Sequence, residues 1–327
     1  MKKNNALLTA LLAGALGFSL SACGPTEQAP AAQAAAEPQQ PSVETAAAPE
    51  TTPEATPESE APVDDTAVAE SSTGYVPSET PITVTIGTTS DDPRLWDALQ
   101  AELDERGDNI IVEFKSIDGA LLNQAVADGE IDLNSFQHYA YFNQVKTDQN
   151  LDLTAIGETL IVPLNLFSTK YQSLDEIPEG GKIAVPADAT NQGRALNVLK
   201  NAGLITLNSE AGAGATIKDI ADNPKNLEIL ELDGSQIARS LEDVDAGVIN
   251  CGYAVDAGLD INAPLYQDAI DLSNPEQQPY INIIVAKTSE INNPVYLEVV
   301  DAYQSAKVYD ATIDRFSGAA IPAFDRE

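Results

Sequence analysis

Residues 82–103 read ITVTIGTTSDDPRLWDALQAEL and place a strand directly before a helix. From 82 to 87 the residues alternate and are rich in β-branched side chains, which is typical of a strand. After Pro93 the apolar residues recur at helical spacing as far as about Arg106, on one face that contains Leu95, Trp96, Leu99 and Leu103. This strand–helix unit predicts an α/β fold.

The same alternation continues along the chain. We expect further strands at 110–114, 131–133, 182–185, 227–232 and 246–249. We expect helices between them at 120–127, 137–147, 191–202 and 235–241. Strands that alternate with helices form sheets rich in parallel pairs, and ligands bind such sheets at the carboxyl ends of the strands.

Two extended runs, 153–168 and 280–287, lack this rhythm and flank the second α/β unit. A pair of segments that crosses between two lobes would leave a cleft at the hinge, as in a two-lobed binding protein. Two long strands of a single sheet would give the same pattern. The runs themselves leave both arrangements open.

The N-terminus has the pattern of an export signal. Lys2 and Lys3 precede an apolar stretch at 6–20, which is too short to span a bilayer comfortably. The sequence Leu-Ser-Ala-Cys at 20–23 resembles a bacterial lipobox, so we expect a signal peptide at 1–22 and a lipid anchor on Cys23. An ordinary signal peptide whose cleavage site contains a cysteine is the alternative.

The next segment, 24–81, is rich in Ala, Pro, Glu and Thr and contains no Lys or Arg. Tyr75 is its single aromatic residue. Such a composition buries too little apolar surface to offset the entropy of ordering. We therefore expect residues 23–80 to be a lipidated cysteine with a disordered acidic linker, and residues 81–327 to be the globular domain.

The chain carries 17 basic and 51 acidic residues, a formal net charge of −34. This charge argues against nucleic acid as a partner, because phosphate binding needs a basic surface. It also argues against adsorption to anionic lipid, so membrane attachment would depend on the acyl chain. With Cys23 lipidated, Cys251 is left without a disulfide partner, and we expect a small buried residue there. A reactive thiol at the rim of a site is the alternative.

Motifs of catalysis are absent from the sequence. It contains no H-E-x-x-H, no G-x-S-x-G and no P-loop, and His138 is its single histidine. A metal site of several histidines is therefore excluded. We expect no catalytic residues, no cofactor and no metal. An exported enzyme with His138 as its base is the alternative.

Two clusters could bind a ligand. NSFQHYAY at 134–141 lies at a strand–helix junction and combines aromatic rings with hydrogen-bonding groups, although such rings are also common in a core. TNQGRA at 190–195 lies at a helix start, where Thr190 or Asn191 could cap the helix. Free N–H groups there attract a carboxylate, and Arg194 could add a bidentate grip. An exposed arginine is the alternative.

Both clusters, together with VINCGYA at 248–254, resemble the NlpA family of methionine-binding lipoproteins. The resemblance covers residues 82–327 and includes segments 129–132, 173–176, 223–227 and 318–323. It implies a type II periplasmic-binding-protein-like fold, in which two α/β lobes are joined by two crossing strands. Lobe 1 would contain 81–164 and 284–327, and lobe 2 would contain 165–283.

The resemblance also implies a function. The chain would be the substrate-binding component of a methionine ABC importer and would deliver its ligand to a membrane permease with a cytoplasmic ATPase. By position, Arg194 would hold the ligand carboxylate, and Asn250 and Asn191 would bind the polar groups at its α-carbon. Phe136, His138 and Tyr141 would surround the side chain, where a thioether can lie against aromatic faces.

The sequence departs from the family pattern at three places. Gly252 replaces an asparagine, residues 116–119 lack an expected aromatic, and residues 88–93 lack a common Pro-Gly-Pro-His pattern. A larger pocket would result, so a methionine dipeptide or another apolar amino acid remains open as the ligand. A surface interaction protein, such as an adhesin, that keeps the fold without transport is the alternative from another class.

Overall fold

The computed structural model describes residues 72–326, which belong to one compact unit. The predicted signal peptide, Cys23 and the linker as far as residue 71 lie outside the described residues. Within 72–326, no helix has the length and apolar character needed to cross a membrane.

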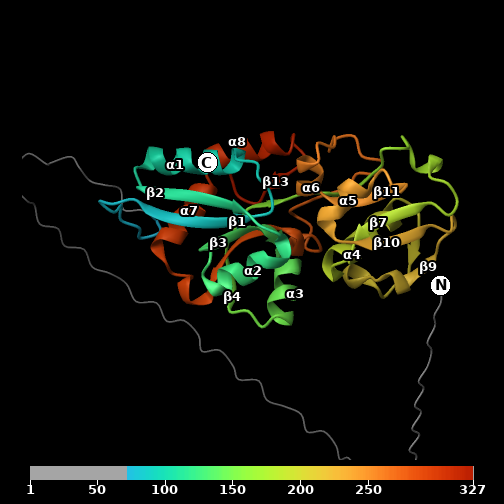
Figure 1. Cartoon of the computed structure of the whole chain (residues 1–327), viewed down its shortest axis with the longest axis horizontal. Helices are drawn as coiled ribbons and strands as arrows, with labels where there is room; N and C mark the ends of the chain where they lie inside the picture. The colour runs from blue at the N-terminus through green and yellow to red at the C-terminus, as the bar shows by residue number, and fades with distance from the viewer. Residues whose placement is uncertain (1–71, 327) are drawn as a thin grey trace, which may run out of the picture. The chain divides into compact units, whose positions relative to one another are not determined.

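A five-stranded sheet forms the first half of the unit, in the order β2-β1-β3-β12-β4 (Figure 1). Its strands are β1 (Ile82–Thr88), β2 (Ile110–Ser116), β3 (Leu133–His138), β4 (Leu153–Glu158) and β12 (Asn282–Lys287). β1 pairs in parallel with β2 and β3, whereas β12 is antiparallel to β3 and β4. We call the part built on this sheet lobe 1.

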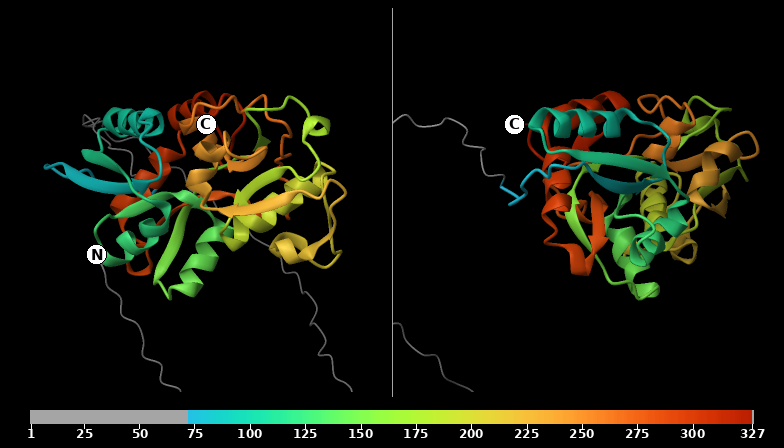
Figure 2. Two further views of the ribbon diagram at one scale, coloured as in Figure 1. Left: turned by 45° about the vertical axis from the view of Figure 1, so that its right-hand side comes forward. Right: turned by 60° about the vertical axis from the view of Figure 1, so that its left-hand side comes forward.

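Helices cover both faces of the lobe 1 sheet. One face packs against α1 (Arg94–Arg106), α7 (Pro294–Tyr303) and α8 (Ala306–Arg315). The other packs against α2 (Gly119–Asp128) and α3 (Tyr139–Asp148), which lie across the sheet from α1 (Figures 1 and 2). The predicted apolar face of α1 is confirmed, because Leu95, Trp96, Leu99 and Leu103 are all buried.

A four-stranded sheet, in the order β10-β7-β11-β6, forms what we call lobe 2. Its strands are β6 (Leu164–Phe167), β7 (Lys182–Pro186), β10 (Glu228–Leu232) and β11 (Ala246–Asn250). α4 (Ala189–Asn201) packs on one face, and α5 (Gly234–Ser240) and α6 (Cys251–Asp256) pack on the other (Figure 1). The parallel pairs of β7 with β10 and β11 agree with the predicted α/β pattern.

Short elements complete the unit. Two-stranded sheets join β5 (Leu160–Ile161) to β13 (Ile321–Pro322) and β8 (Thr206–Leu207) to β9 (Ile220–Asp222). Single turns of 3-10 helix lie at Leu174–Glu176, Gly212–Gly214, Ile217–Asp219, Gln278–Tyr280 and Thr288–Glu290.

The extended run at 153–168 crosses between the two sheets rather than forming one long strand. It contributes β4 to lobe 1, then β5, then β6 to lobe 2. The second run behaves differently: 282–287 belongs entirely to the lobe 1 sheet as β12. Tyr266 is still bridged to Leu166 of lobe 2, so the return crossing is the irregular segment between Tyr266 and Tyr280.

The last turn of α8 and the residues after it reach lobe 2, although the sequence assigns 284–327 to lobe 1. Phe316 and Ala320 are buried in the same apolar cluster as Cys251 and Ala254 of α6. Burial of these side chains gives the C-terminal segment a third connection between the lobes, next to β5 and β13.

Residues 72–80, which the sequence places in the linker, contact lobe 1. Tyr75 is buried in the lobe 1 core, and its hydroxyl donates to the carbonyl of Asp108 at 2.6 Å. Thr73 donates to Glu298 at 2.5 Å. The single aromatic residue of the segment supplies the apolar surface that orders its last residues, so the globular part begins earlier than residue 81.

Candidate functional site

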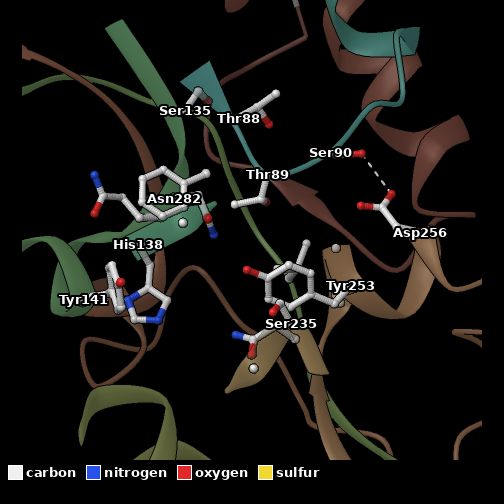
Figure 3. Close-up of a pocket in the computed structure, with 18 of the residues that line it drawn as sticks. Thr88, Thr89, Ser90, Ser135, His138, Tyr141, Ser235, Tyr253, Asp256 and Asn282 are labelled. Atoms are coloured by element: carbon white, nitrogen blue, oxygen red, sulfur yellow. Dashed lines mark hydrogen bonds between the residues drawn. The ribbon is translucent and has the colours of Figure 1, made fainter. Parts of the chain in front are cut away.

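A cavity of about 560 Å³ lies between the lobes (Figure 3). Lobe 1 lines it with the loops after β1 and β2 and with the end of β3. Lobe 2 lines it with the loops after β7, β10 and β11. Each is the carboxyl end of a strand in a parallel pair, the position that an α/β sheet offers to a ligand. The cavity has the size of a small-molecule site.

All six residues predicted to bind a ligand line this cavity: Phe136, His138, Tyr141, Asn191, Arg194 and Asn250. They come from β3 and α3 of lobe 1 and from α4 and β11 of lobe 2. The tertiary structure therefore brings together three separate segments of the sequence, at 136–141, 191–194 and 250.

His138 is the buried residue at the junction of β3 and α3. Its Nδ1 accepts the backbone N–H of Tyr141 at 3.1 Å, which leaves the proton on Nε2. Nε2 then donates to Oδ1 of Asn191 across the cavity at 3.2 Å. Burial, with a smaller contribution from the charge of Arg194, lowers the pKa of His138 to about 4. The imidazole is neutral at pH 7 and adds no charge to the cavity.

Asn191 is fixed at both ends of its amide. Its Nδ2 donates to the two carboxylate oxygens of Asp188, each at 3.1 Å. Its Oδ1 accepts from His138 and, at 2.8 Å, from Nδ2 of Asn250. This bond uses one of the two hydrogens on Nδ2 of Asn250, so its Oδ1 and its second amide hydrogen are available to a ligand.

The cap of α4 is Asp188 rather than the predicted Thr190 or Asn191. The Asp188 side chain accepts the backbone N–H of Asn191 at 2.9 Å. Gly193, which lies within the predicted 190–195 cluster, permits close packing of α4. A Cβ at this position would lie 2.1 Å from the carbonyl oxygen of Ala213.

Arg194 is buried and is held by both crossing segments. Its Nη2 donates to the carbonyl of Val162 at 2.8 Å and to Oδ2 of Asp268 at 2.9 Å. Its guanidinium carbon lies 4.6 Å from the ring centroid of Tyr280. The predicted alternative of an exposed arginine is wrong. These contacts fix the plane of a guanidinium whose other nitrogens can form a bidentate pair with a carboxylate.

Aromatic rings form one wall of the cavity. The rings of Phe136 and Tyr141 meet edge to face at 6.0 Å, and the imidazole of His138 lies edge to face with Tyr141 at 6.5 Å and with Tyr280 at 5.5 Å. Figure 3 shows His138 and Tyr141 together on one side of the pocket. An apolar or sulfur-containing side chain fits such a wall.

Open space lies where the sequence departs from the family pattern. A Cβ at Gly252 would meet no atom within 4 Å, and Gly252 lines the cavity. Tyr253, the next residue, points into the pocket in Figure 3. Its neighbour Cys251 is buried, and burial raises the pKa of that thiol to about 12. A protonated, inaccessible thiol of this kind is unreactive.

Sequence reasoning missed several residues in and behind the cavity wall. Tyr280 and Asp268, which contact Arg194 from outside the cavity lining, lie in the irregular return crossing, where no periodicity or motif marks them. Ser90 and Asp256 lie on the opposite side of the pocket from His138 in Figure 3, and Arg315, which also lines the cavity, donates to both of them. The departure of the 88–93 loop from the family pattern was the one sequence signal near them.

Two α/β lobes, crossing segments and an inter-lobe cavity lined by strand ends define a two-lobed substrate-binding protein. The sequence model of the NlpA lipoprotein family matches residues 84–324. The chain belongs to this family.

Three known proteins illustrate the similarity. The probable D-methionine-binding lipoprotein MetQ of Vibrio cholerae is 41% identical over 199 residues, which cover 61% of this chain and 72% of that protein. The substrate-binding protein of a methionine transporter from Streptococcus pneumoniae has a TM-score of 0.69 and 38% identity, over 74% of this chain and 96% of that one. A nutrient-binding protein from Burkholderia cenocepacia, whose structure was solved bound to methionine, has a TM-score of 0.67 and 34% identity. The match covers 74% of this chain and 100% of that one.

Proposed function

We propose that this chain captures methionine, or a close relative of it, between its lobes and delivers it to an ABC importer. One observation carries the proposal: a buried, oriented guanidinium and an aromatic wall face one cavity of amino-acid size. An amino acid needs a cationic clamp, neutral polar groups and an apolar pocket, and the cavity offers all three. The names of the MetQ relatives and of the Streptococcus and Burkholderia proteins support methionine as the ligand.

In this proposal each predicted residue has one role. Arg194 binds the carboxylate, Asn250 binds a polar group at the α-carbon, and Phe136 and Tyr141 contact the side chain. The imidazole ring of His138 forms part of the aromatic wall. Asn191 acts mainly by holding His138 and Asn250 in place, since its own amide is already occupied.

No bond is made or broken in the proposed activity. His138 lacks the properties of a general base, because its Nδ1 accepts a backbone N–H and its pKa is far below neutrality. The described residues, 72–326, also contain no cluster of three or more metal-ligating side chains suited to a metal ion. The importer's permease and ATPase would couple release of the ligand to transport.

The proposed location follows from the family and the N-terminus. Lipid on Cys23 would hold the chain outside the cytoplasm, at a bacterial membrane, and residues 24–71 would separate it from the globular domain. Within that domain we propose hinge positions near residues 164 and 284, the predicted lobe boundaries. The start of β6 at Leu164 supports the first position. Residue 284 lies inside β12, so the second hinge would fall just before Asn282, where the return crossing ends.

A thermal-shift screen of the Cys23→Ser chain tests the proposal, after unfolding and refolding to remove ligand carried over from expression. A large rise in melting temperature with L-methionine supports it, and the D-enantiomer tests the choice that the relatives' names suggest. A response limited to methionine dipeptides would support the larger ligand that open space at Gly252 permits. A folded sample that responds to no amino acid or dipeptide would favour an interaction protein instead.

A further inference from the structure

A second buried arginine, Arg315, lies in the cavity wall at the end of α8. Its Nη1 pairs with Asp92 of the β1–α1 loop at 2.8 Å. Its Nη2 donates to Ser90 at 3.0 Å and to Oδ1 of Asp256 at 3.1 Å. Ser90 also donates to Oδ1 of Asp256, at 2.9 Å (Figure 3). We call these four residues the brace.

Asp256 is the one member of the brace that belongs to lobe 2. It is the last residue of α6, whereas Ser90, Asp92 and Arg315 belong to lobe 1. A single carboxylate oxygen thus receives two hydrogen bonds from the other lobe. Bonds to a charged acceptor in a shielded site are stronger than neutral ones, so this contact favours the arrangement in which the lobes meet.

The charge balance of the brace distinguishes Arg315 from Arg194. Two aspartates face Arg315, one of which, Asp92, it shares with Arg94, whereas one aspartate faces Arg194. Arg315 thus has more of its charge balanced within the protein than Arg194 does. If Asp256 withdraws, Arg315 keeps Asp92 and Ser90 within its own lobe. No buried charge is then left unpaired, which avoids the large penalty of breaking a buried pair. The contact is therefore suited to repeated opening and closing.

We propose that Asp256 and Arg315 are positioning residues that stabilise the closed arrangement of the lobes and thereby slow ligand release. This inference rests on the proposed function. Arg315 is followed by Phe316, which packs in the core of lobe 2, so the brace lies beside the segments that connect the lobes. A small angular change there produces a larger displacement at Tyr141 and Asn191, on the other side of the cavity.

Replacement Asp256→Asn tests the role of the charge while keeping the size of the side chain. We expect the dissociation rate of the ligand to rise about tenfold, with little change in the association rate. Every ligand should lose affinity by the same factor, because the brace acts on closure and not on ligand contacts. Asp314→Asn is the matched control: Asp314 precedes Arg315 on α8 and forms an exposed pair with Arg94 inside lobe 1.

Stopped-flow kinetics with two ligands of different size provides the measurement. A dissociation rate within twofold of wild type for Asp256→Asn would overturn the proposal. So would an affinity loss that differs between the two ligands, since that result would make Asp256 a ligand contact. Ser90→Ala should give a smaller effect of the same kind. In the Asp256→Asn background it should add less than it does alone, because both changes remove the same inter-lobe contact.

Measuring a distance between the lobes tests the brace independently of the identity of the ligand. Fluorophores on Gln149→Cys in lobe 1 and Lys218→Cys in lobe 2, in the Cys23→Ser chain, would report it, because both side chains are exposed. Asp256→Asn should shift the unliganded population toward longer distances, and Asp314→Asn should not. If wild type binds none of the ligands screened, the proposed function fails while this readout still tests the brace. An unchanged distribution would then overturn the brace.

Discussion

Nε2 of His138 in lobe 1 lies 3.2 Å from Oδ1 of Asn191 in lobe 2, so one hydrogen bond joins the lobes across the cavity. The amide oxygen of Asn191 also accepts from Asn250, and its nitrogen donates to Asp188. The network leaves a single choice for the tautomer of His138 and for the orientation of the Asn191 amide. The side chains of His138, Asn191 and Asn250 are neutral, so they hold the polar side of the cavity while the carboxylate of Asp188 anchors Asn191 from behind.

Asn191→Asp should weaken ligand binding by about 1–3 kcal/mol, because the new carboxylate loses the donor to Asp188 and faces that acid directly. Isothermal titration with methionine measures the loss. Asn201→Asp, the same change at an exposed position of α4, is the control and should bind normally. Normal binding by Asn191→Asp would show that the network does not control the cavity.

Arg194→Ala should lower methionine affinity by roughly 2–5 kcal/mol, since the ligand carboxylate would lose its charged partner. Arg194→Lys should recover only part of the loss, because an ammonium cannot form the bidentate pair. Because alanine also leaves Asp268 without its partner, circular dichroism and Arg194→Ala/Asp268→Asn should accompany the titration. Tight binding by a folded Arg194→Ala protein would remove Arg194 from the carboxylate site.

Tyr141→Ala should lower affinity for amino acids with apolar side chains by about 0.5–1.5 kcal/mol, the typical contribution of an aromatic or sulfur–aromatic contact. Tyr141→Phe keeps the ring and should bind nearly as wild type. The informative quantity is the ratio of affinities for methionine and alanine, measured for each variant. A ratio that Tyr141→Ala leaves unchanged would argue against contact between this ring and the ligand side chain.

Gly252→Asn should fold with a free energy of unfolding within about 0.5 kcal/mol of wild type, because its side chain enters open space in the cavity. By reducing that space, it should favour free methionine over a dipeptide. Gly193→Ala is the contrasting change and should destabilise the protein, since its Cβ would collide with the backbone of Ala213. Denaturant unfolding and competition binding measure the two effects. If the Gly252→Asn protein still preferred a dipeptide, the space that accommodates the second residue of the dipeptide would not be at position 252.

His138 and Asp108 are both buried, and we expect them to change the stability of the protein in opposite directions as the pH falls. The pKa of His138 is lowered from 6.5 to about 4, so the unfolded chain takes up its proton first and stability falls by roughly 3 kcal/mol between pH 6.5 and 4. Burial and then Glu298 raise the pKa of Asp108 from 3.8 to about 6, so its contribution rises as the pH falls from 6 toward 4.

Urea unfolding from pH 7.5 to 4 separates the two groups. His138→Gln should flatten the loss of stability on acidification, and Asp108→Asn should steepen it. Identical pH profiles for wild type and His138→Gln would mean that the imidazole takes up its proton as readily in the folded protein as in the unfolded chain.

Local patterns in the sequence determined much of the fold. The alternating residues of β1 and the apolar face of α1 were sufficient for strand and helix, because one buried face imposes a period of two or 3.6 residues on an element. The clusters at 134–141 and 190–195 were found for a related reason. Ligand groups in α/β proteins follow the carboxyl ends of strands, and strand ends can be read from a sequence.

Contacts between distant segments were decided only by the tertiary structure. Nothing in residues 266–281 marks Asp268 or Tyr280 as partners of Arg194, because an irregular segment has no period and its position depends on both lobes. The assignment of 282–287 to one sheet depended in the same way on the pairing of β12 with β3 and β4. The sequence by itself determined which residues could bind an amino acid. The fold decided that Arg194 faces the cavity with one aspartate beside it while Arg315 pairs with two, because that depends on which carboxylates come within hydrogen-bonding distance of each guanidinium.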